Sequence, residues 1–147
     1  MLKRKGIKRK GMTGGKPRVK LLTVSQAKKK IQARLRELAI SRDGGCILRL
    51  YPETGLCGGY SGSGLILQAE HLCGRANSAS YADMDNIICI CLNHHFFYKK
   101  RHGAVYWDVV KRHIGARRWK KVQEYERDKT PHHFVASEWR TILAELQ

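Results

Sequence analysis

Apolar residues at helical spacing predict a helix near the start of the chain. A capping-box pattern opens this segment, with Thr23 followed three positions later by Gln26, and the pair Gly44 and Gly45 closes it. One face carries the apolar residues Val24, Ala27, Ile31, Leu35 and Leu38. This stripe predicts a side that faces the core, while the lysines and arginines between these positions form a solvated or nucleic-acid-facing surface.

Helical spacing returns in the last third of the chain. After Gly103, two apolar segments are separated at Gly115, and a final helix is expected after an N-cap at Ser137. The apolar positions are Val105, Val109 and Ile114, then Trp119, Val122 and Tyr125, and finally Trp139, Ile142, Leu143 and Leu146. They predict a helical C-terminal extension over residues 104–147, and packing in the core is favoured over base stacking for Trp107 and Trp119.

Between these helical regions the apolar segments are short and irregularly spaced. Residues 65–71, LILQAEH, predict a strand, and residues 46–57, with a turn at Pro52 to Gly55, are expected to form a hairpin whose ends meet. A short helix is expected from 92 to about 101. Together the elements predict an α+β fold in one domain, residues 21–147.

The chain carries a large excess of positive charge. Lys and Arg number 29 against 12 Asp and Glu, a formal charge of +17, so a nucleic acid is the expected partner. Residues 1–20 hold nine of these cations and no acid, which predicts a disordered arm that contacts phosphates. Its candidate contacts are Lys3, Arg4, Lys5, Lys8, Arg9 and Lys10. With no apolar run long enough for a membrane and no secretory signal core, the cytoplasm is the expected location.

Cysteine and histidine gather in residues 88–100, ICICLNHHFFYKK. The chain has five cysteines, an odd number, and no sign of secretion, so metal ligation or free thiols are favoured over disulfide bonds. Adjacent helical side chains diverge by about 100°, so His94 and His95 are expected to serve different sites. Cys91 has helical spacing to both, and geometry alone leaves its partner open.

Four residues in order resemble the motif of the HNH nuclease family. Glu70 and His71 come together at a strand end, Asn86 follows the next loop, and His95 lies on a short helix. The resemblance covers roughly residues 46–103 and implies a ββα-metal core. It also implies a metal-dependent endonuclease that hydrolyses DNA phosphodiester bonds.

Many members of the family carry a zinc knuckle whose second half comes just before the last histidine of the motif. Cys91 and His94 fit this order, so the resemblance assigns His94 to structural zinc and His95 to the catalytic site. Cys46 and Cys57 complete a donor set that is typical of a closed structural Zn²⁺ site. Cys46 and Cys57 are separated by ten residues rather than the usual two to four. If one of them is not a zinc ligand, Cys73 and Cys89 are the substitutes.

Within the family, the stretch AEHLCGRANSASYADMDNIICICLNHH resembles phage recombination nucleases of the NinG (Rap) type. The segments His71 to Arg75 and Cys91 to His95, with the basic arm, are similar to the phage Ref nuclease. These resemblances imply branched or recombination-associated DNA as substrate and a recombination protein as a further partner. They also imply the cytoplasm of a phage-infected or bacterial host cell as the location.

The motif residues suit the chemistry of phosphodiester hydrolysis. Neutral imidazole can deprotonate water near pH 7, which makes His71 the candidate general base. Glu70 and His95 would bind one divalent ion, Mg²⁺, Mn²⁺, Ni²⁺ or Zn²⁺, with His102 as a reserve ligand. The amide of Asn86 can tie its loop to the backbone beside the base. Candidate phosphate contacts are Arg75, Lys99, Lys100 and Arg101.

Two other functions compete with cleavage. A zinc-stabilised DNA-binding protein would carry the same motif without cutting, and a basic RNA-binding protein would have the same arm and charge. The ordered set Glu70, His71, Asn86 and His95 favours the nuclease over the RNA-binding protein.

Overall fold

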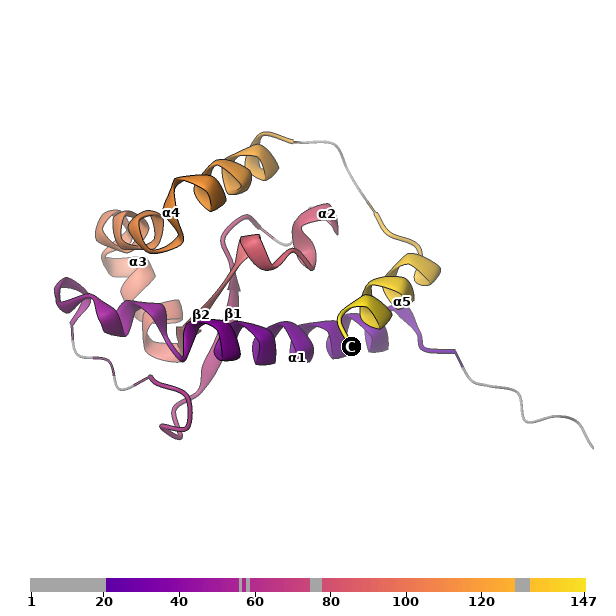
Figure 1. The fold of residues 1–147 in the computed structure, drawn as a ribbon, viewed down its shortest axis with the longest axis horizontal. Helices are drawn as coiled ribbons and strands as arrows, with labels where there is room; N and C mark the ends of the chain where they lie inside the picture. Colours follow the sequence, from indigo (N-terminus) through magenta and orange to yellow (C-terminus); the bar gives the residue numbers. More distant parts are fainter. Residues whose placement is uncertain (1–20, 56, 58, 75–77, 129–132) are drawn as a thin grey trace, which may run out of the picture.

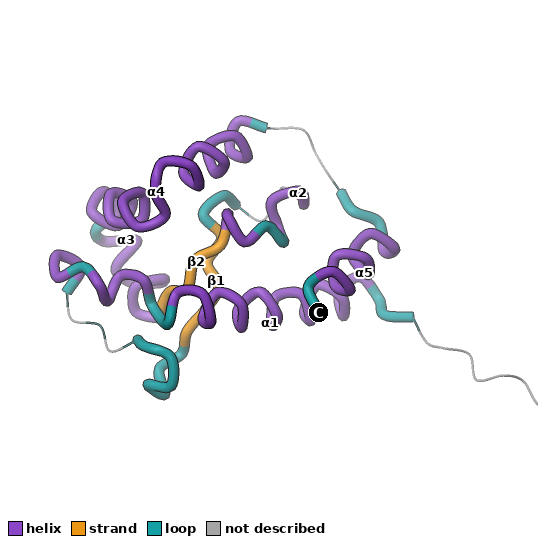
Figure 2. The backbone as a smooth tube through the Cα atoms, viewed as in Figure 1, coloured by secondary structure: helices purple, strands orange, loops and turns teal. Residues whose placement is uncertain are grey.

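The computed structural model describes residues 21–55, 57, 59–74, 78–128 and 133–147 as helices around a small two-stranded sheet (Figure 1). The main elements are helices α1 (Val24–Asp43), α4 (Gly103–Arg127) and α5 (Ala136–Glu145), and strands β1 (Leu67–His71) and β2 (Ile87–Cys91). The short helical turns are η1 (Ile47–Leu50), η2 (Pro52–Thr54), α2 (Ser78–Tyr81), η3 (Met84–Asn86), η4 (His94–Tyr98) and α3 (Lys99–Arg101). The expected α+β class is confirmed, and Figure 2 shows how small the sheet is beside the helices.

Helix α1 forms for the local reasons that its sequence suggests. Thr23 Oγ1 accepts the N–H of Gln26 at 3.2 Å, and Gln26 Oε1 accepts the N–H of Thr23 at 3.0 Å, which completes the capping box. The helix ends at Gly44, which has the left-handed φ of 64° that glycine adopts without strain. Its buried residues, Ala27, Ile31, Leu35 and Ala39, lie on the side that contacts both strands and α5.

Strands β1 and β2 form an antiparallel ribbon next to α1. Its register pairs Leu67 with Cys91, Gln68 with Ile90, Ala69 with Cys89, Glu70 with Ile88 and His71 with Ile87. A two-stranded ribbon is marginal in water by itself. Here the outer edge of β2 is satisfied by side chains, because Asp43 accepts the N–H of Cys89 at 2.8 Å and Arg118 donates to the carbonyl of Ile87 at 2.9 Å. Helices α1 and α4 therefore hold the ribbon through its backbone as well as its apolar faces.

The C-terminal helices complete the core. Gly115 interrupts α4 with φ 77° and ψ 166°, at the glycine where the sequence predicted a break. Helix α5 packs on α1 through Trp139, whose side chain is 2% exposed. Trp107 and Trp119 are partly buried against the core with ring centroids 6.0 Å apart, so the packed interpretation of these tryptophans is confirmed.

Three local expectations were wrong. Residues 46–57 form two tight helical turns rather than a hairpin, because Thr54 Oγ1 donates to the carbonyls of Leu48 and Tyr51 and closes the chain locally. The two ends of this segment still approach each other, since the N–H of Cys46 donates to the carbonyl of Gly59 in the loop just after Cys57. The other two corrections are small: β1 starts at Leu67 rather than 65, and the N-cap of α5 is Val135 rather than Ser137.

Candidate functional site

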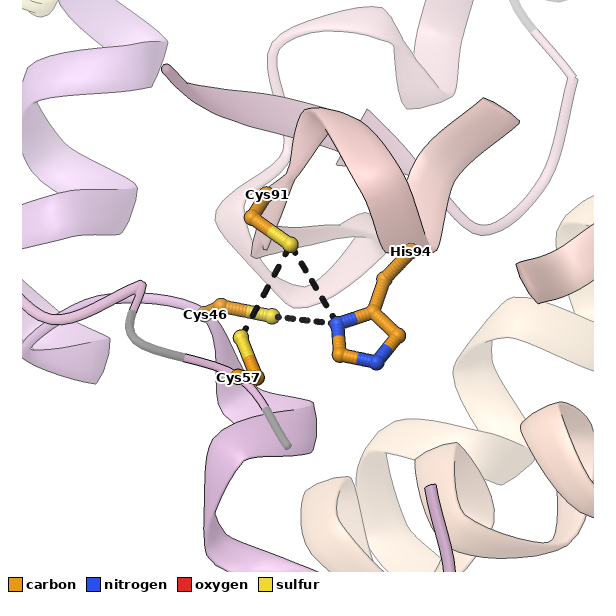
Figure 3. A group of neighbouring side chains, drawn as sticks. All are labelled: Cys46, Cys57, Cys91 and His94. Atoms are coloured by element: carbon orange, nitrogen blue, oxygen red, sulfur yellow. Dashed lines mark hydrogen bonds between the residues drawn. The ribbon is translucent and has the colours of Figure 1, made fainter. Parts of the chain in front are cut away.

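Four side chains singled out by the sequence gather beside the sheet. Cys46 precedes η1, Cys57 follows η2, Cys91 ends β2 and His94 opens η4. Their ligand atoms all lie within 4.8 Å of one another, and Figure 3 shows the four converging from separate segments. Three of the four are buried and Cys57 is half-buried. The predicted set is therefore close enough to hold a metal ion.

The spacing of the ligand atoms fits a tetrahedral site. Zn–S bonds of about 2.3 Å and Zn–N bonds of about 2.0–2.1 Å at tetrahedral angles separate two sulfurs by about 3.8 Å and a sulfur from a nitrogen by about 3.6 Å. The Sγ atoms of Cys57 and Cys91 lie 3.7 Å apart. His94 Nδ1 lies 3.4 Å from Cys46 Sγ and 3.3 Å from Cys91 Sγ. Three thiols with one imidazole are also a donor set of structural zinc sites.

The orientation of His94 is set from outside the cluster. Its Nε2 lies 3.2 Å from the carbonyl oxygen of Thr54 in η2. Because a carbonyl only accepts, Nε2 carries the ring proton in the neutral imidazole and Nδ1 presents its lone pair to the sulfurs. The η2 turn, fixed by the hydroxyl bonds of Thr54, thus selects the tautomer that a metal needs.

The thiols of the cluster differ in acidity. Hydrogen bonding from the Cys46 thiol lowers the pKa of Cys91, and the same contact together with burial raises the pKa of Cys46. Burial raises the pKa of the Cys57 thiol. Cys91 is therefore the most acidic of the three thiols. Metal binding at this cluster should release protons.

Two glycines let the backbone close around the cluster. A Cβ at Gly59 would lie 3.0 Å from Cys46 Cβ and 3.2 Å from both Cys57 Sγ and Cys91 Cβ. A Cβ at Gly45, where φ is 131°, would lie 2.3 Å from the carbonyl oxygen of Gly59. Side chains at these positions would push the first two cysteines away from β2, so the cluster depends on both glycines.

Within turn η4, the side chains of the two adjacent histidines point to different partners. Residues His94–Tyr98 form a π-helical turn, a form that is frequent at functional sites. His94 faces the cysteines, whereas His95 Nδ1 lies 2.6 Å from Gln68 Oε1 and His95 Nε2 lies 2.5 Å from Glu70 Oε2. The expected divergence is confirmed, and the partner of Cys91 that spacing left open is His94.

Glu70 is the centre of a second polar cluster. It is buried in β1, and its two carboxylate oxygens have different partners: Oε2 binds His95, and Oε1 binds Lys99 Nζ at 2.5 Å. The Lys99 ammonium also lies 5.3 Å from the ring centroid of Tyr106 and 5.0 Å from that of Trp107. This lysine, a candidate phosphate contact in the sequence, thus points inward to the carboxylate.

His71, the candidate base, ends β1 and is buried, at 8% exposure. Its Nε2 lies 2.8 Å from the carbonyl oxygen of Tyr81, and its ring packs on the Tyr81 ring with centroids 5.2 Å apart. The carbonyl accepts, so the neutral imidazole carries its proton on Nε2 and its basic lone pair on Nδ1. Tyr81 thereby fixes both the tautomer and the ring plane.

Asn86 ties the loop that follows His71 back to the start of β2. Its Oδ1 accepts the N–H of Cys73 at 2.7 Å, and its Nδ2 donates to the carbonyls of Cys73 at 3.3 Å and Ser80 at 3.1 Å. Its own carbonyl accepts the N–H of Leu72 at 2.8 Å. The sequence predicted a backbone tie beside His71, and this residue makes one; its effect on catalysis stays a prediction.

A cleft of about 300 Å³ opens where α1 approaches the ribbon and η4. Both His71 and His95 line it. The other lining residues are Gln32, Leu35 and Arg36 from α1, Gln68 and Ala69 from β1, and Phe96 from η4. Sequence reasoning missed the α1 wall and Gln68, since nothing in the local pattern shows which helix residues meet a strand more than 30 positions away.

The remaining candidate residues fall into three groups. Cys73 and Cys89 lie outside the group of four ligands, and His102 contacts the Tyr98 ring with centroids 4.8 Å apart. Lys100 and Arg101 are exposed on α3. Outside the described residues lie Arg75 and the arm cations Lys3, Arg4, Lys5, Lys8, Arg9 and Lys10.

None of the helices in the described part of the chain combines the length and apolar character that a membrane span requires. No protein-family model, curated protein or solved structure matches the chain.

Proposed function

We propose that the protein is a metal-dependent endonuclease of the HNH type that hydrolyses DNA phosphodiester bonds, with a core held together by structural zinc. The observation that carries this proposal is the meeting of His71 and His95 at one cleft, with Glu70 bonded to His95. Hydrolysis needs a base for water and a cation for the charge that accumulates on phosphate. His71 would supply the base, and Glu70 and His95 can hold the cation.

The structural zinc is supported by the tetrahedral spacing of the cysteines and His94. A zinc ion there would join the η1–η2 segment to the end of β2 and the start of η4. It would therefore fix the turn from which His95 projects. A small domain gains much of its stability from such a link.

His71 is the proposed general base. With Nε2 directed at the Tyr81 carbonyl, the buried Nδ1 is the atom that would accept a proton, so water must gain access to it when substrate binds. Asn86 is a positioning residue in this scheme, because it holds the backbone of Cys73, two residues after His71, and of Ser80, which is next to Tyr81. Loss of this tie would let the imidazole rotate away from the cleft.

Glu70 and His95 fit one divalent ion, with one carboxylate oxygen and one imidazole nitrogen already adjacent. Bound Mg²⁺, Mn²⁺, Ni²⁺ or Zn²⁺ would stabilise negative charge on the phosphate. To become a ligand, His95 Nε2 would present its lone pair to the ion in place of its present contact with Glu70 Oε2. Lys99 would remain bonded to the other oxygen of Glu70, where it reduces the negative charge available to the ion.

DNA is the proposed partner because of the chain's charge. Residues 99–121 contain nine Lys or Arg against one Asp, and Lys100 and Arg101 are exposed beside the π turn. Neutralisation of phosphates by such cations releases counterions and drives binding. Branched or recombination-associated DNA, with a recombination protein as a further partner, remains the specific form of this proposal that the sequence resemblance favours.

The second candidate is a zinc-stabilised DNA-binding protein that does not cleave. The Lys99 ammonium favours it, because this cation already occupies one oxygen of the carboxylate that would bind the catalytic ion. In that case the zinc cluster and the basic surface would be functional and the Glu70 cluster would be structural.

The test is a cleavage panel with the full chain. Labelled linear duplex, single-stranded and four-way-junction DNA and a matched RNA would be incubated without added metal and with Mg²⁺, Mn²⁺, Ni²⁺ or Zn²⁺. Metal-dependent cleavage of DNA is the expected result, and it should persist in His133→Ala, which changes an exposed histidine before α5. Tight DNA binding with no cleavage under any metal would favour the second candidate, and preference for RNA would reject both.

A further inference from the structure

The cleft beside the proposed catalytic pair has two walls of different chemistry. Its α1 wall presents the polar ends of Gln32 and Arg36, and its η4 wall presents the ring of Phe96. His71 and His95 line the same cleft. A cation and an aromatic ring that line one cleft suit a ligand with an anionic end and a flat apolar end.

Arg36 is held as a fixed donor on the α1 wall. Its Nε donates to the carbonyl oxygen of Leu67 at 2.6 Å, where β1 begins. Among the described residues, no salt bridge or hydrogen bond engages its terminal Nη atoms. An arginine that is anchored through Nε presents two N–H donors in a plane, which is the geometry that holds a phosphate through two bonds.

Phe96 presents an exposed aromatic surface in the same cleft. Its side chain is 54% exposed, and its ring tilts against that of His95 with centroids 4.4 Å apart. Burial in a core therefore does not explain this phenylalanine. Its neighbour Phe97 is similarly exposed, at 57%, but lines a separate apolar pocket with Leu65 and Leu92.

We infer that the cleft binds one nucleotide whose base is unpaired, with Arg36 on its phosphate and Phe96 stacked on its base. The inference rests on the proposed function for its link to cleavage. A paired base is covered by its neighbours in the duplex, so it cannot place its face on Phe96, whereas a flap, bulge or junction nucleotide can. The volume of about 300 Å³ is at the lower end of the range for small-molecule sites. The preferred substrate class is thus DNA with an unpaired nucleotide next to the scissile phosphate.

Binding without cleavage tests this inference. The full chain, without added divalent ion, would be titrated by fluorescence anisotropy against two DNA duplexes. They differ only in that one carries a single-nucleotide bulge. The bulged duplex should bind roughly tenfold more tightly, as expected for one stacked base. Phe96→Leu should abolish this ratio, and Phe96→Tyr should retain it.

Two matched controls separate stacking from general damage. Phe97→Leu removes the same kind of ring from the neighbouring pocket and should leave the ratio unchanged. Arg36→Gln should weaken bulge binding more than Lys29→Gln, which removes an exposed cation from the same helix. With 5-iodouracil in the bulge, photocrosslinking should map to Phe96. An unchanged ratio in Phe96→Leu, equal effects of the two phenylalanines, or crosslinks to other residues would overturn the inference.

The two proposals fail in different ways. If wild-type protein cleaves DNA but binds both duplexes equally, the endonuclease stands and the nucleotide cleft is rejected. If the protein never cleaves but shows the bulge preference through Phe96, the cleft stands as a binding site and the catalytic proposal is rejected.

Discussion

Replacement of His94 by alanine should remove the structural metal and most of the stability of the domain. His94 is 1% exposed, and it contacts Cys46 and Cys91 through Nδ1 and Thr54 through Nε2. If the loss of one ligand of four weakens zinc binding about a thousandfold, the zinc-linked stability falls by about 4 kcal/mol. A buried Thr54 carbonyl left without this donor adds about 1–3 kcal/mol.

The sum, about 5–7 kcal/mol, is comparable to the whole stability of an ordinary domain, about 5–15 kcal/mol. The variant should therefore contain less than one zinc per chain and melt roughly 20 °C or more below the wild type. Zinc content by elemental analysis and unfolding by circular dichroism would be measured on the same samples.

His95→Ala is the matched control for this prediction. It removes the neighbouring imidazole but none of the zinc contacts, because His95 binds Gln68 and Glu70. Its zinc content should equal that of the wild type, and its melting temperature should change far less than that of His94→Ala. Equal zinc loss in the two variants, or zinc loss in His95→Ala alone, would refute the division of the histidines between two sites.

Asn86, Lys99 and residues 1–20 can each be tested separately. Asn86→Ala should destabilise the domain by about 3 kcal/mol, because the backbone of Cys73 and Ser80 loses buried partners; a change below 1 kcal/mol in chemical unfolding would argue against the tie. Lys99→Met should tighten divalent-ion binding about tenfold in calorimetry, since it removes a competing cation from Glu70; weaker binding would mean that the lysine supports the ion. Deletion of residues 1–20 should weaken binding to all DNA sequences alike and reduce its salt dependence; unchanged affinity and salt slope would show that the arm makes no phosphate contact.

The parts of the fold that the sequence predicted are those with local causes. The capping box of Thr23 and Gln26, the stop at Gly44 and the break at Gly115 each depend on a few neighbouring residues. The divergence of His94 and His95 also follows from local geometry, because adjacent side chains on any helical turn point in different directions. These features therefore appeared in the structure where they were expected.

The parts that were missed depend on contacts between distant segments. The turn signal at Pro52 to Gly55 indicated a hairpin between Cys46 and Cys57, but the hydroxyl of Thr54 closes two helical turns instead. The anchoring of Arg36 on Leu67 requires α1 to lie across β1, which no local pattern reveals. Likewise, a run of basic residues gives no sign that Lys99 turns inward to a buried carboxylate.

The most direct test of the central claim is the cleavage rate of His71→Ala relative to wild type at saturating Mn²⁺, with zinc content measured on both proteins. The wild type and His71→Ala should each contain one zinc per chain and bind DNA with equal affinity. The cleavage rate of the variant should be lower by about 10² or more. Wild-type cleavage retained in His71→Ala would contradict the assignment of the base. Absence of cleavage by the zinc-loaded wild type with every metal and DNA form would contradict the proposed activity itself.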